Sequence, residues 1–186
     1  MEQKQEQYYT YEQWLNLDTD GYTELIDGQI HLMADPTSRH QMVQMELSGQ
    51  IWTYLKDKPC QIFTAPFGVR LHEDKDTAFE PDIVVLCDPS KLQDRGCAGP
   101  PDMIIEILSP STEKNDRILK YNEYMQAGVK EYWIVDPINN QVIANRLMDY
   151  NYNTTIYFET NTAPIQILPG CEIDLSLVFR DISHGF

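Results

Sequence analysis

The chain contains few cysteines for its length, and these form no recognisable ligand or redox pattern. They are scattered, none belongs to a Cys-x-x-Cys pair, and no histidine stands near one at a zinc-ligand spacing. A chain of 186 residues can bury a full hydrophobic core without a covalent cross-link. We therefore expect buried free thiols, and neither a disulfide framework nor a zinc site. The cysteines are Cys60, Cys87, Cys97 and Cys171.

Long apolar runs are also missing. No segment approaches the roughly 20 apolar residues that a membrane-spanning helix needs. The polar start MEQKQEQYY lacks the apolar core of a signal peptide. We therefore expect a cytoplasmic protein that does not contact a membrane. Internal repeats, low-complexity segments and linkers are absent as well, which predicts a single domain over residues 1–186.

Basic residues are scarce. Lysine and arginine together number 14 against 29 aspartates and glutamates, which gives a formal net charge of −15. Proteins that bind nucleic acids usually carry a basic surface, because contacts to phosphates supply much of their affinity. A role with nucleic acid would therefore need a local positive patch, a metal ion or a partner subunit.

Turn and capping residues predict the first elements of the fold. Thr10 and Gln13 form a capping box at the start of a short helix. The dipeptide Asp27-Gly28 between two apolar runs predicts a hairpin over residues 22–33. Thr37 is expected to cap a long helix that ends near residue 56, because apolar residues recur through it at helical spacing.

The remainder of the chain alternates strands with one further helix. A strand–helix–strand passage from residue 103 to residue 135 predicts one parallel crossover, and hairpins on either side predict antiparallel pairs. We expect the helix to be capped by Ser111 or Thr112 and to end at Gly128. The fold class is therefore a mixed α/β (α+β) fold with a central mixed β-sheet flanked by helices. The predicted strands cover residues 62–71, 78–86, 103–108, 131–136, 142–147 and 152–158.

Two acids interrupt apolar strands and are the first candidates for chemistry. Asp82 opens the run IVVL, and Glu106 stands within MIIEIL. Buried carboxylates are rare unless they are paired or bind a metal. Two of them on neighbouring strands would suit Mg²⁺ or Mn²⁺, which prefer oxygen ligands. The alternative is that each acid is exposed at a strand end or pairs with a nearby lysine or arginine.

Three further residues are candidates. Lys120 shares one helix face with Asp116 and Tyr124, at positions i, i+4 and i+8, and its ammonium could orient a water or neutralise a phosphate. The alternative is an ordinary surface pair between Lys120 and Asp116. Glu24, in the apolar hairpin strand, could add a carboxylate from a separate element. His40, early in the long helix, could stand at the mouth of a cleft or simply contribute to packing.

Several segments together resemble a known family. They are YTELIDGQI at residues 22–30, EPDIVVL at 80–86, PDMIIEILSPST at 101–112 and DRILKYNEYMQAGVKEYWIVDP at 116–137. These strings are similar to the Uma-two family, a widespread group of bacterial proteins labelled restriction endonucleases, within the PD-(D/E)XK nuclease superfamily. The resemblance extends from about residue 10 to residue 179 and implies a restriction-endonuclease-like fold.

The resemblance also implies a metal site. It assigns Asp82 and Glu106 as ligands of Mg²⁺ or Mn²⁺, with Glu24 as a further acid and catalytic residue. The lysine that the superfamily motif has two residues after its second acid is replaced here by Leu108, which carries no charge. The resemblance suggests that the lysine has moved, and Lys120 matches the position in the following helix.

These features favour a magnesium-dependent endonuclease that hydrolyses phosphodiester bonds in DNA. One alternative is a catalytically inactive module that uses the same fold for binding or assembly, which the acidic composition and Leu108 favour. Another is a hydrolase of small phosphate compounds. Enzymes that cut both strands commonly act in pairs, so we expect a homo-oligomer, most simply a dimer. The tyrosine-rich C-terminal third would supply its interface, or would form an ordinary sheet face. Its aromatic residues are Tyr150, Tyr152, Tyr157 and Phe158.

Overall fold

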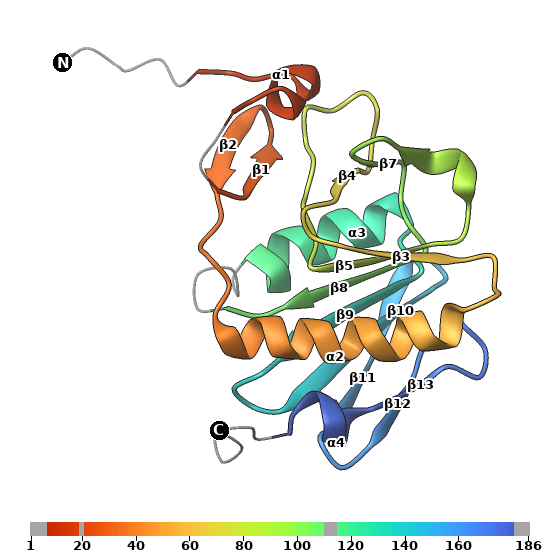
Figure 1. Cartoon of the computed structure of the whole chain (residues 1–186). Coiled ribbons are helices and arrows are strands. Elements are labelled where there is room, and N and C mark those ends of the chain that lie inside the picture. Colours follow the sequence, from red (N-terminus) through yellow and green to blue (C-terminus); the bar gives the residue numbers. More distant parts are fainter. Residues whose placement is uncertain (1–6, 19–20, 110–114, 181–186) are drawn as a thin grey trace.

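The computed structural model describes residues 7–18, 21–109 and 115–180 (Figure 1). Its helical elements are α1 (Tyr11–Leu15), α2 (Ser38–Leu55), the short 3-10 turn η1 (Pro89–Lys91), the π-helical segment η2 (Asn115–Lys120), α3 (Tyr121–Ala127) and α4 (Leu175–Val178). Its strands are β1 (Thr23–Ile26), β2 (Gln29–Leu32), β3 (Gln61–Thr64), β4 (Gly68–Arg70), β5 (Ile83–Leu86), β6 (Leu92–Gln93), β7 (Gly96–Ala98), β8 (Met103–Ile107), β9 (Glu131–Asp136), β10 (Gln141–Met148), β11 (Asn151–Phe158), β12 (Thr162–Pro164) and β13 (Glu172–Asp174).

A six-stranded mixed sheet forms the centre of the fold, in the order β11-β10-β9-β8-β5-β3. Strands β8 and β9 run parallel, and every other neighbouring pair in this sheet is antiparallel. The parallel pair arises because the chain passes from β8 through η2 and α3 before it enters β9. The predicted fold class and the predicted crossover are therefore confirmed.

Turn chemistry and capping explain the N-terminal elements. Thr10 accepts a hydrogen bond from the backbone N–H of Gln13, whose side chain accepts one from the backbone N–H of Thr10, so the capping box is present. Asp27 and Gly28 have φ angles of 49° and 74°, the left-handed conformation that a two-residue hairpin turn requires. Thr37 caps α2. All three predicted elements are confirmed.

Two predicted strands were wrong in extent. Residues 62–71 form two strands, β3 and β4, which belong to different sheets. In the predicted strand 78–86 only the second half forms β5, while Ala78 and Phe79 make isolated bridges to other segments. A proline interrupts each run, Pro66 in the first and Pro81 in the second. Proline has no N–H to give to a strand ladder, so the continuous apolar pattern did not produce continuous strands.

The predicted second helix begins differently from the expectation. Its first described part is the π-helical segment η2, which continues directly into α3. Gly128 ends α3 in the left-handed conformation, with a φ of 90°, as predicted. The predicted caps, Ser111 and Thr112, lie outside the described residues. No helix in the described ranges is long and apolar enough to cross a membrane.

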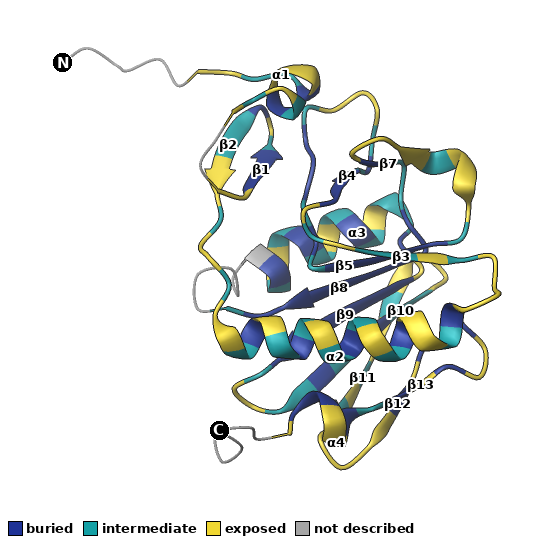
Figure 2. Cartoon of the chain, in the orientation of Figure 1, coloured by how far each residue is buried: buried dark blue, intermediate teal, exposed yellow. Residues whose placement is uncertain are grey.

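Two apolar clusters cover the opposite faces of the central sheet. On one face, Val43, Leu47 and Ile51 of α2 are fully buried and pack in one cluster with Ile105 and Trp133. The other face is covered by α3 and by the small sheet β4-β7-β6 (Figure 1). Figure 2 shows the central strands almost wholly buried between these layers. Because side chains alternate along a strand, neighbouring residues of β8 belong to different layers.

A disulfide joins the ends of two sheet strands, which corrects the expectation of four free thiols. Cys60 directly precedes β3 and Cys87 directly follows β5. The antiparallel register pairs Gln61 with Leu86, so the two cysteines face each other with their Cα atoms 4.0 Å apart. The bond links the edge strand β3 to its neighbour β5. The strand register brings the two sulfurs together, and the spacing of the cysteines in the sequence does not reveal this.

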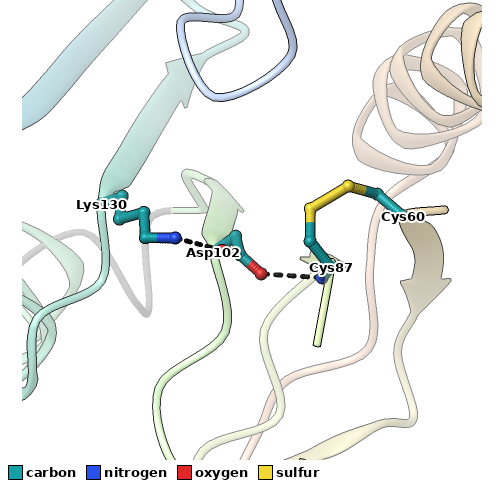
Figure 3. Close-up of a disulfide and its surroundings, with 4 residues drawn as sticks. All are labelled: Cys60, Cys87, Asp102 and Lys130. Carbon is teal, nitrogen blue, oxygen red and sulfur yellow. Dashed lines mark hydrogen bonds and ion pairs between the residues drawn. A yellow bond between two sulfur atoms is a disulfide. The ribbon is translucent and has the colours of Figure 1, made fainter. Parts of the chain in front are cut away.

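The surroundings of this disulfide are polar. Asp102 accepts a 2.7 Å hydrogen bond from the backbone N–H of Cys87, and its other oxygen lies 2.6 Å from the Lys130 ammonium (Figure 3). The remaining cysteines, Cys97 and Cys171, are free and buried, as expected. Burial raises the pKa of the Cys97 thiol to about 12. Burial also raises the pKa of the Cys171 thiol to about 11, so both thiols stay protonated and act as small apolar groups.

Candidate active site

Two of the predicted acids meet where β5 begins and β8 ends. The antiparallel register places Ile83 opposite Ile105, so Asp82, which precedes β5, lies beside the last residues of β8. The Oδ2 atom of Asp82 accepts a 2.7 Å hydrogen bond from the backbone N–H of Ile107. Glu106 is the neighbour of Ile107 in the same strand. The pairing of β5 with β8 therefore brings Asp82 and Glu106 close together, although they are far apart in the sequence.

These acids lie in a cleft of about 470 Å³. The Asp82 side chain is 18% exposed and that of Glu106 is 5% exposed, so both are mostly buried in the lining of the cleft. Two further acids line it, Asp35 and Glu80, together with His40. No lysine or arginine lines it within the described part of the chain. The cleft is therefore rich in carboxylate oxygens and poor in fixed positive charge.

Lys120 lies behind the cleft and binds three carboxylates at once. Its Nζ lies 2.8 Å from Oε1 of Glu24, 2.9 Å from Oε1 of Glu106 and 3.3 Å from Oδ1 of Asp116. The side chains of Lys120 and Glu24 are each only 1% exposed, which excludes the alternative of an ordinary surface pair. Burial alone would lower the pKa of Lys120, but the charges of Glu106, Glu24 and Asp116 raise the pKa well above its ordinary value. The ammonium therefore stays protonated.

The helix face that carries Lys120 also supplies a phenol to Glu106. The hydroxyl of Tyr124 donates a 2.9 Å hydrogen bond to Oε1 of Glu106. Burial, and then the charge of Glu106, hold the pKa of Tyr124 well above its ordinary value, so the phenol remains a donor. The predicted alignment of Asp116, Lys120 and Tyr124 on one face is confirmed. Leu108, at the position of the motif lysine, is instead buried in the apolar layer.

Helix α2 holds Asp82 from the other side. The Nε2 atom of His40 lies 3.2 Å from Oδ2 of Asp82, and Gln44 donates a 2.8 Å hydrogen bond to the backbone carbonyl of Asp82. Burial alone would lower the pKa of His40, but the hydrogen bond and the charge of Asp82 outweigh it and raise the pKa above its ordinary value. His40 therefore stands in the cleft against an acid, and packing is not its only role.

Glu80 is a site residue that the sequence pattern did not reveal. It lines the cleft, and its Oε2 atom is buried without a hydrogen-bond partner among the described residues. Its backbone N–H donates a 3.3 Å hydrogen bond to Oε1 of Glu24. Burial, with a further contribution from the charge of Glu24, raises the pKa of Glu80 to about 7. Its position two residues before Asp82 was the available signal, because residues i and i+2 of an extended segment share a face.

We expect Glu80 to make the folded protein less stable as the pH rises. Its pKa is about 7 in the folded state against an ordinary value of 4.5, so its contribution to stability is complete below 4.5 and disappears as the pH rises through about 7. The difference corresponds to at most about 3 kcal/mol. Glu80→Gln should therefore raise the free energy of unfolding at pH 8 relative to wild type, with little gain at pH 4.5.

Urea unfolding of both proteins across this pH range measures the effect. The matched control is Glu73→Gln, which changes an exposed glutamate in the same segment. The difference in free energy of unfolding between this control and wild type should not depend on pH. If the free energy of unfolding of Glu80→Gln differs from that of wild type by the same amount at every pH from 4.5 to 8, the raised pKa of Glu80 is contradicted.

The buried group around Lys120 carries more negative than positive charge. Burial raises the pKa of Glu106 well above its ordinary value, although the charge of Lys120 acts in the opposite direction. The ammonium of Lys120 cannot neutralise all the carboxylates near it. This cluster of acids therefore favours uptake of a proton or of a cation. The acids concerned are Glu24, Glu80, Asp82, Glu106 and Asp116.

The cleft fits a hard divalent cation. Carboxylate oxygens are the preferred ligands of Mg²⁺ and Mn²⁺, and Glu80 contributes an unpartnered buried oxygen beside Asp82 and Glu106. Within the described ranges, no three histidine, cysteine, aspartate or glutamate side chains are already arranged around one point as ligands. Mg²⁺ commonly needs only one or two carboxylates, with water and substrate phosphates as its other ligands. The Oε1 atom of Glu24 contacts Lys120 in this structure. The role of Glu24 as a metal ligand stays a prediction.

Sequence comparisons match nearly the whole chain to one family. The sequence model of the Uma2 (Uma-two) family, described as "Putative restriction endonuclease", matches residues 6–176. The chain is 30% identical to slr1290 of Synechocystis sp. (strain ATCC 27184 / PCC 6803 / Kazusa) over 54% of its own length and 53% of that protein. It is 26% identical to sll1609 of the same organism over 61% of its own length and 66% of that protein. The chain therefore spans about half to two thirds of these relatives.

A solved structure resembles the fold over almost its entire length. It is a crystal structure of a protein from Anabaena variabilis ATCC 29413, described as a "putative nuclease belonging to DUF820". The two structures superpose with a TM-score of 0.75 at 21% sequence identity, covering 91% of this chain and 97% of the other. At this identity the similarity establishes the fold, which is restriction-endonuclease-like as predicted.

Proposed function

Because this chain belongs to the Uma2 family, we propose that it is a nuclease that hydrolyses phosphodiester bonds of DNA with the help of Mg²⁺ or Mn²⁺. The observation that carries the proposal is that Asp82, directly before β5, and Glu106, near the end of the adjacent antiparallel strand β8, line one cleft. Their carboxylates provide the oxygen ligands that such a cation prefers. When bound, the cation would lower the pKa of a water and stabilise the negative charge of the phosphoryl group.

The neighbouring side chains orient these two acids. His40 and the backbone N–H of Ile107 hold Oδ2 of Asp82. Lys120 and Tyr124 hold Oε1 of Glu106, and no described side chain makes a hydrogen bond to its Oε2. We therefore propose that Lys120 acts through Glu106, by fixing its carboxylate. The direct action of Lys120 on the attacking water stays a prediction from the sequence.

Calorimetric titration with Mn²⁺ tests the site. We expect wild type to bind the cation, and Asp82→Ala and Glu106→Ala to bind it more than about 100-fold more weakly, since even the outer partners of metal ligands are worth about 10–100-fold. The matched control is Asp35→Asn, which removes an exposed acid from the same cleft and should bind as wild type does. Cleavage of DNA in Mn²⁺ should be lost in the first two variants and kept in the third.

An inactive binding or assembly module is the second candidate. It is favoured by Leu108 at the position of the motif lysine and by the full engagement of Lys120 with carboxylates. This candidate predicts DNA left intact and no increase of melting temperature with Mn²⁺. A melting increase that Glu106→Ala abolishes would count against it. A hydrolase of small phosphate compounds would show the same melting increase but would cleave only small substrates.

Pairing of two chains also stays a prediction. The expected interface residues belong to β11 and to the turn before it, at the edge of the central sheet. Tyr150 is 92% exposed and Phe158 is 54% exposed. Tyr152 and Tyr157 are partly buried and contact residues of their own chain. The exposed aromatic side chains and the open strand edge are compatible with a dimer.

A further inference from the structure

Two basic side chains among the described residues near the cleft, Lys120 and Arg39, are engaged in contacts with other parts of the chain. Lys120, which lies behind it, is fully engaged with Glu24, Glu106 and Asp116. Arg39, next to His40 in the chain, donates hydrogen bonds to the backbone carbonyls of residues 179 and 180. No lysine or arginine is among the described residues that line the cleft. The described lining of the cleft therefore offers the phosphates of a nucleic acid little direct contact with fixed cations.

The two acids of the proposed metal site are mostly buried in the lining of the cleft. The side chain of Glu106 is 5% exposed, and Asp82 is 18% exposed. In a duplex the bases are paired and stacked, so a base can enter a cleft of about 470 Å³ only after it has been unpaired. A single strand is flexible and can bring one nucleotide, with its phosphate, to the bottom of the cleft.

The wall of the cleft offers contacts to an unpaired base. Tyr22, with 39% of its surface exposed, and Met33 lie at the hairpin side, and Met45, 74% exposed, lies on α2. Gln41 adds an amide group among these apolar surfaces. Aromatic and apolar side chains of this kind stack on bases, and amides form hydrogen bonds with base edges. Stacking on the face of an aromatic side chain is available only when the base is unpaired.

We infer that this cleft takes an unpaired nucleotide of a single-stranded nucleic acid, and not a base-paired duplex. The inference rests on the proposed nuclease function and specifies its substrate class. Base stacking on Tyr22 and contacts through the divalent cation supply the affinity that basic side chains supply in other nucleic-acid-binding proteins. Binding should therefore depend on the cation and respond only weakly to salt.

Fluorescence anisotropy in Ca²⁺, with gels to confirm that the probe stays intact, measures binding. The probes are a labelled single-stranded DNA oligonucleotide and the same strand annealed to its complement. We expect the single strand to bind at least about tenfold more tightly than the duplex, and to lose its affinity when Ca²⁺ is chelated. The slope of log affinity against log salt should be shallow, about −0.7 or less in magnitude, which corresponds to one neutralised phosphate or none.

Variants of the cleft wall test the contacts. Tyr22→Ala should weaken binding of the single strand about tenfold, because stacking of a base on an aromatic side chain is worth that much. Trp52→Ala, which changes a more exposed aromatic residue of α2 that does not line the cleft, should bind as wild type does. Gln41→Lys, which adds one ammonium to the cleft, should steepen the salt slope by about 0.7. Unchanged melting temperatures confirm that all three variants fold.

The outcomes separate this inference from the proposed function. Duplex bound as tightly as the single strand, or Tyr22→Ala equal to wild type, would overturn the inference. Cleavage of duplex DNA in Mn²⁺ would then still support a nuclease. If neither probe is bound in Ca²⁺ nor cut in Mn²⁺, the nuclease function fails and the inference fails with it. Preferential binding and cutting of the single strand supports both.

Discussion

Replacing Lys120 with methionine is expected to lower the free energy of unfolding by about 3–5 kcal/mol or more. The substitution keeps the length of the side chain but leaves the carboxylates of Glu24, Glu106 and Asp116 without their shared cation. Removing one partner of a buried ion pair costs this amount, because the remaining charge stays buried and uncompensated. Urea unfolding at pH 8 measures the loss.

The same substitution at an exposed pair is the matched control. Lys130 lies 2.6 Å from Asp102, but its side chain is 65% exposed, so Lys130→Met should cost less than about 1 kcal/mol.

Without Lys120 the pKa of Glu106 should rise further, because the charge of Lys120 lowers it in the wild type. The cost of Lys120→Met should therefore shrink at pH 5, where Glu106 takes up a proton. Equal, small costs for both variants would show that Lys120 is not the centre of the site.

Replacing Glu131 with alanine is expected to destabilise the fold by a similar amount, about 3–5 kcal/mol, without affecting the cleft. Glu131 is fully buried at the start of β9. Its Oε1 accepts hydrogen bonds from the Trp133 indole at 2.8 Å and from Arg146 at 3.3 Å. Its Oε2 accepts bonds from the backbone N–H groups of residues 166 and 167. Alanine would leave these donors and a guanidinium without their acceptor.

Denaturant unfolding and Mn²⁺ titration together test this second prediction. Glu172→Ala, which changes an exposed glutamate of β13, is the control and should leave stability nearly unchanged. Glu131 shares its sheet face with Trp133, whereas Glu106 points to the opposite face, where Lys120 and Tyr124 lie. Folded Glu131→Ala should therefore bind Mn²⁺ as wild type does. Loss of binding in the folded variant would show that the two faces are coupled.

Local chemistry made most of the secondary structure predictable. The capping box at Thr10, the turn Asp27-Gly28 and the cap at Thr37 each act within a few residues, so the sequence alone contained the relevant interactions. The parallel crossover followed from the order strand, helix, strand. Pro66 and Pro81 are local signals as well, because a proline cannot donate an N–H to a strand ladder and therefore limits the length of each strand.

The candidate acids can be found from the sequence because burying a charge in an apolar strand costs free energy in any fold. Asp82 and Glu106 therefore stand out from the apolar residues around them. The partners that surround these acids do not stand out, because they come from separate elements. The engagement of Lys120 with Glu24 requires the hairpin β1–β2 to pack near the end of η2, and no local pattern contains that distance.

The sequence by itself determined α1, α2, the hairpin, the parallel crossover and the two acids, because each depends on neighbours along the chain or on the cost of burying a charge. Only the tertiary structure decided that Cys60 and Cys87 meet, that Lys120 is buried among carboxylates, and that Glu80 lines the cleft. These contacts depend on strand register and on the packing of layers. Both are set by the sum of many long-range contacts, so no single segment of the sequence contains them.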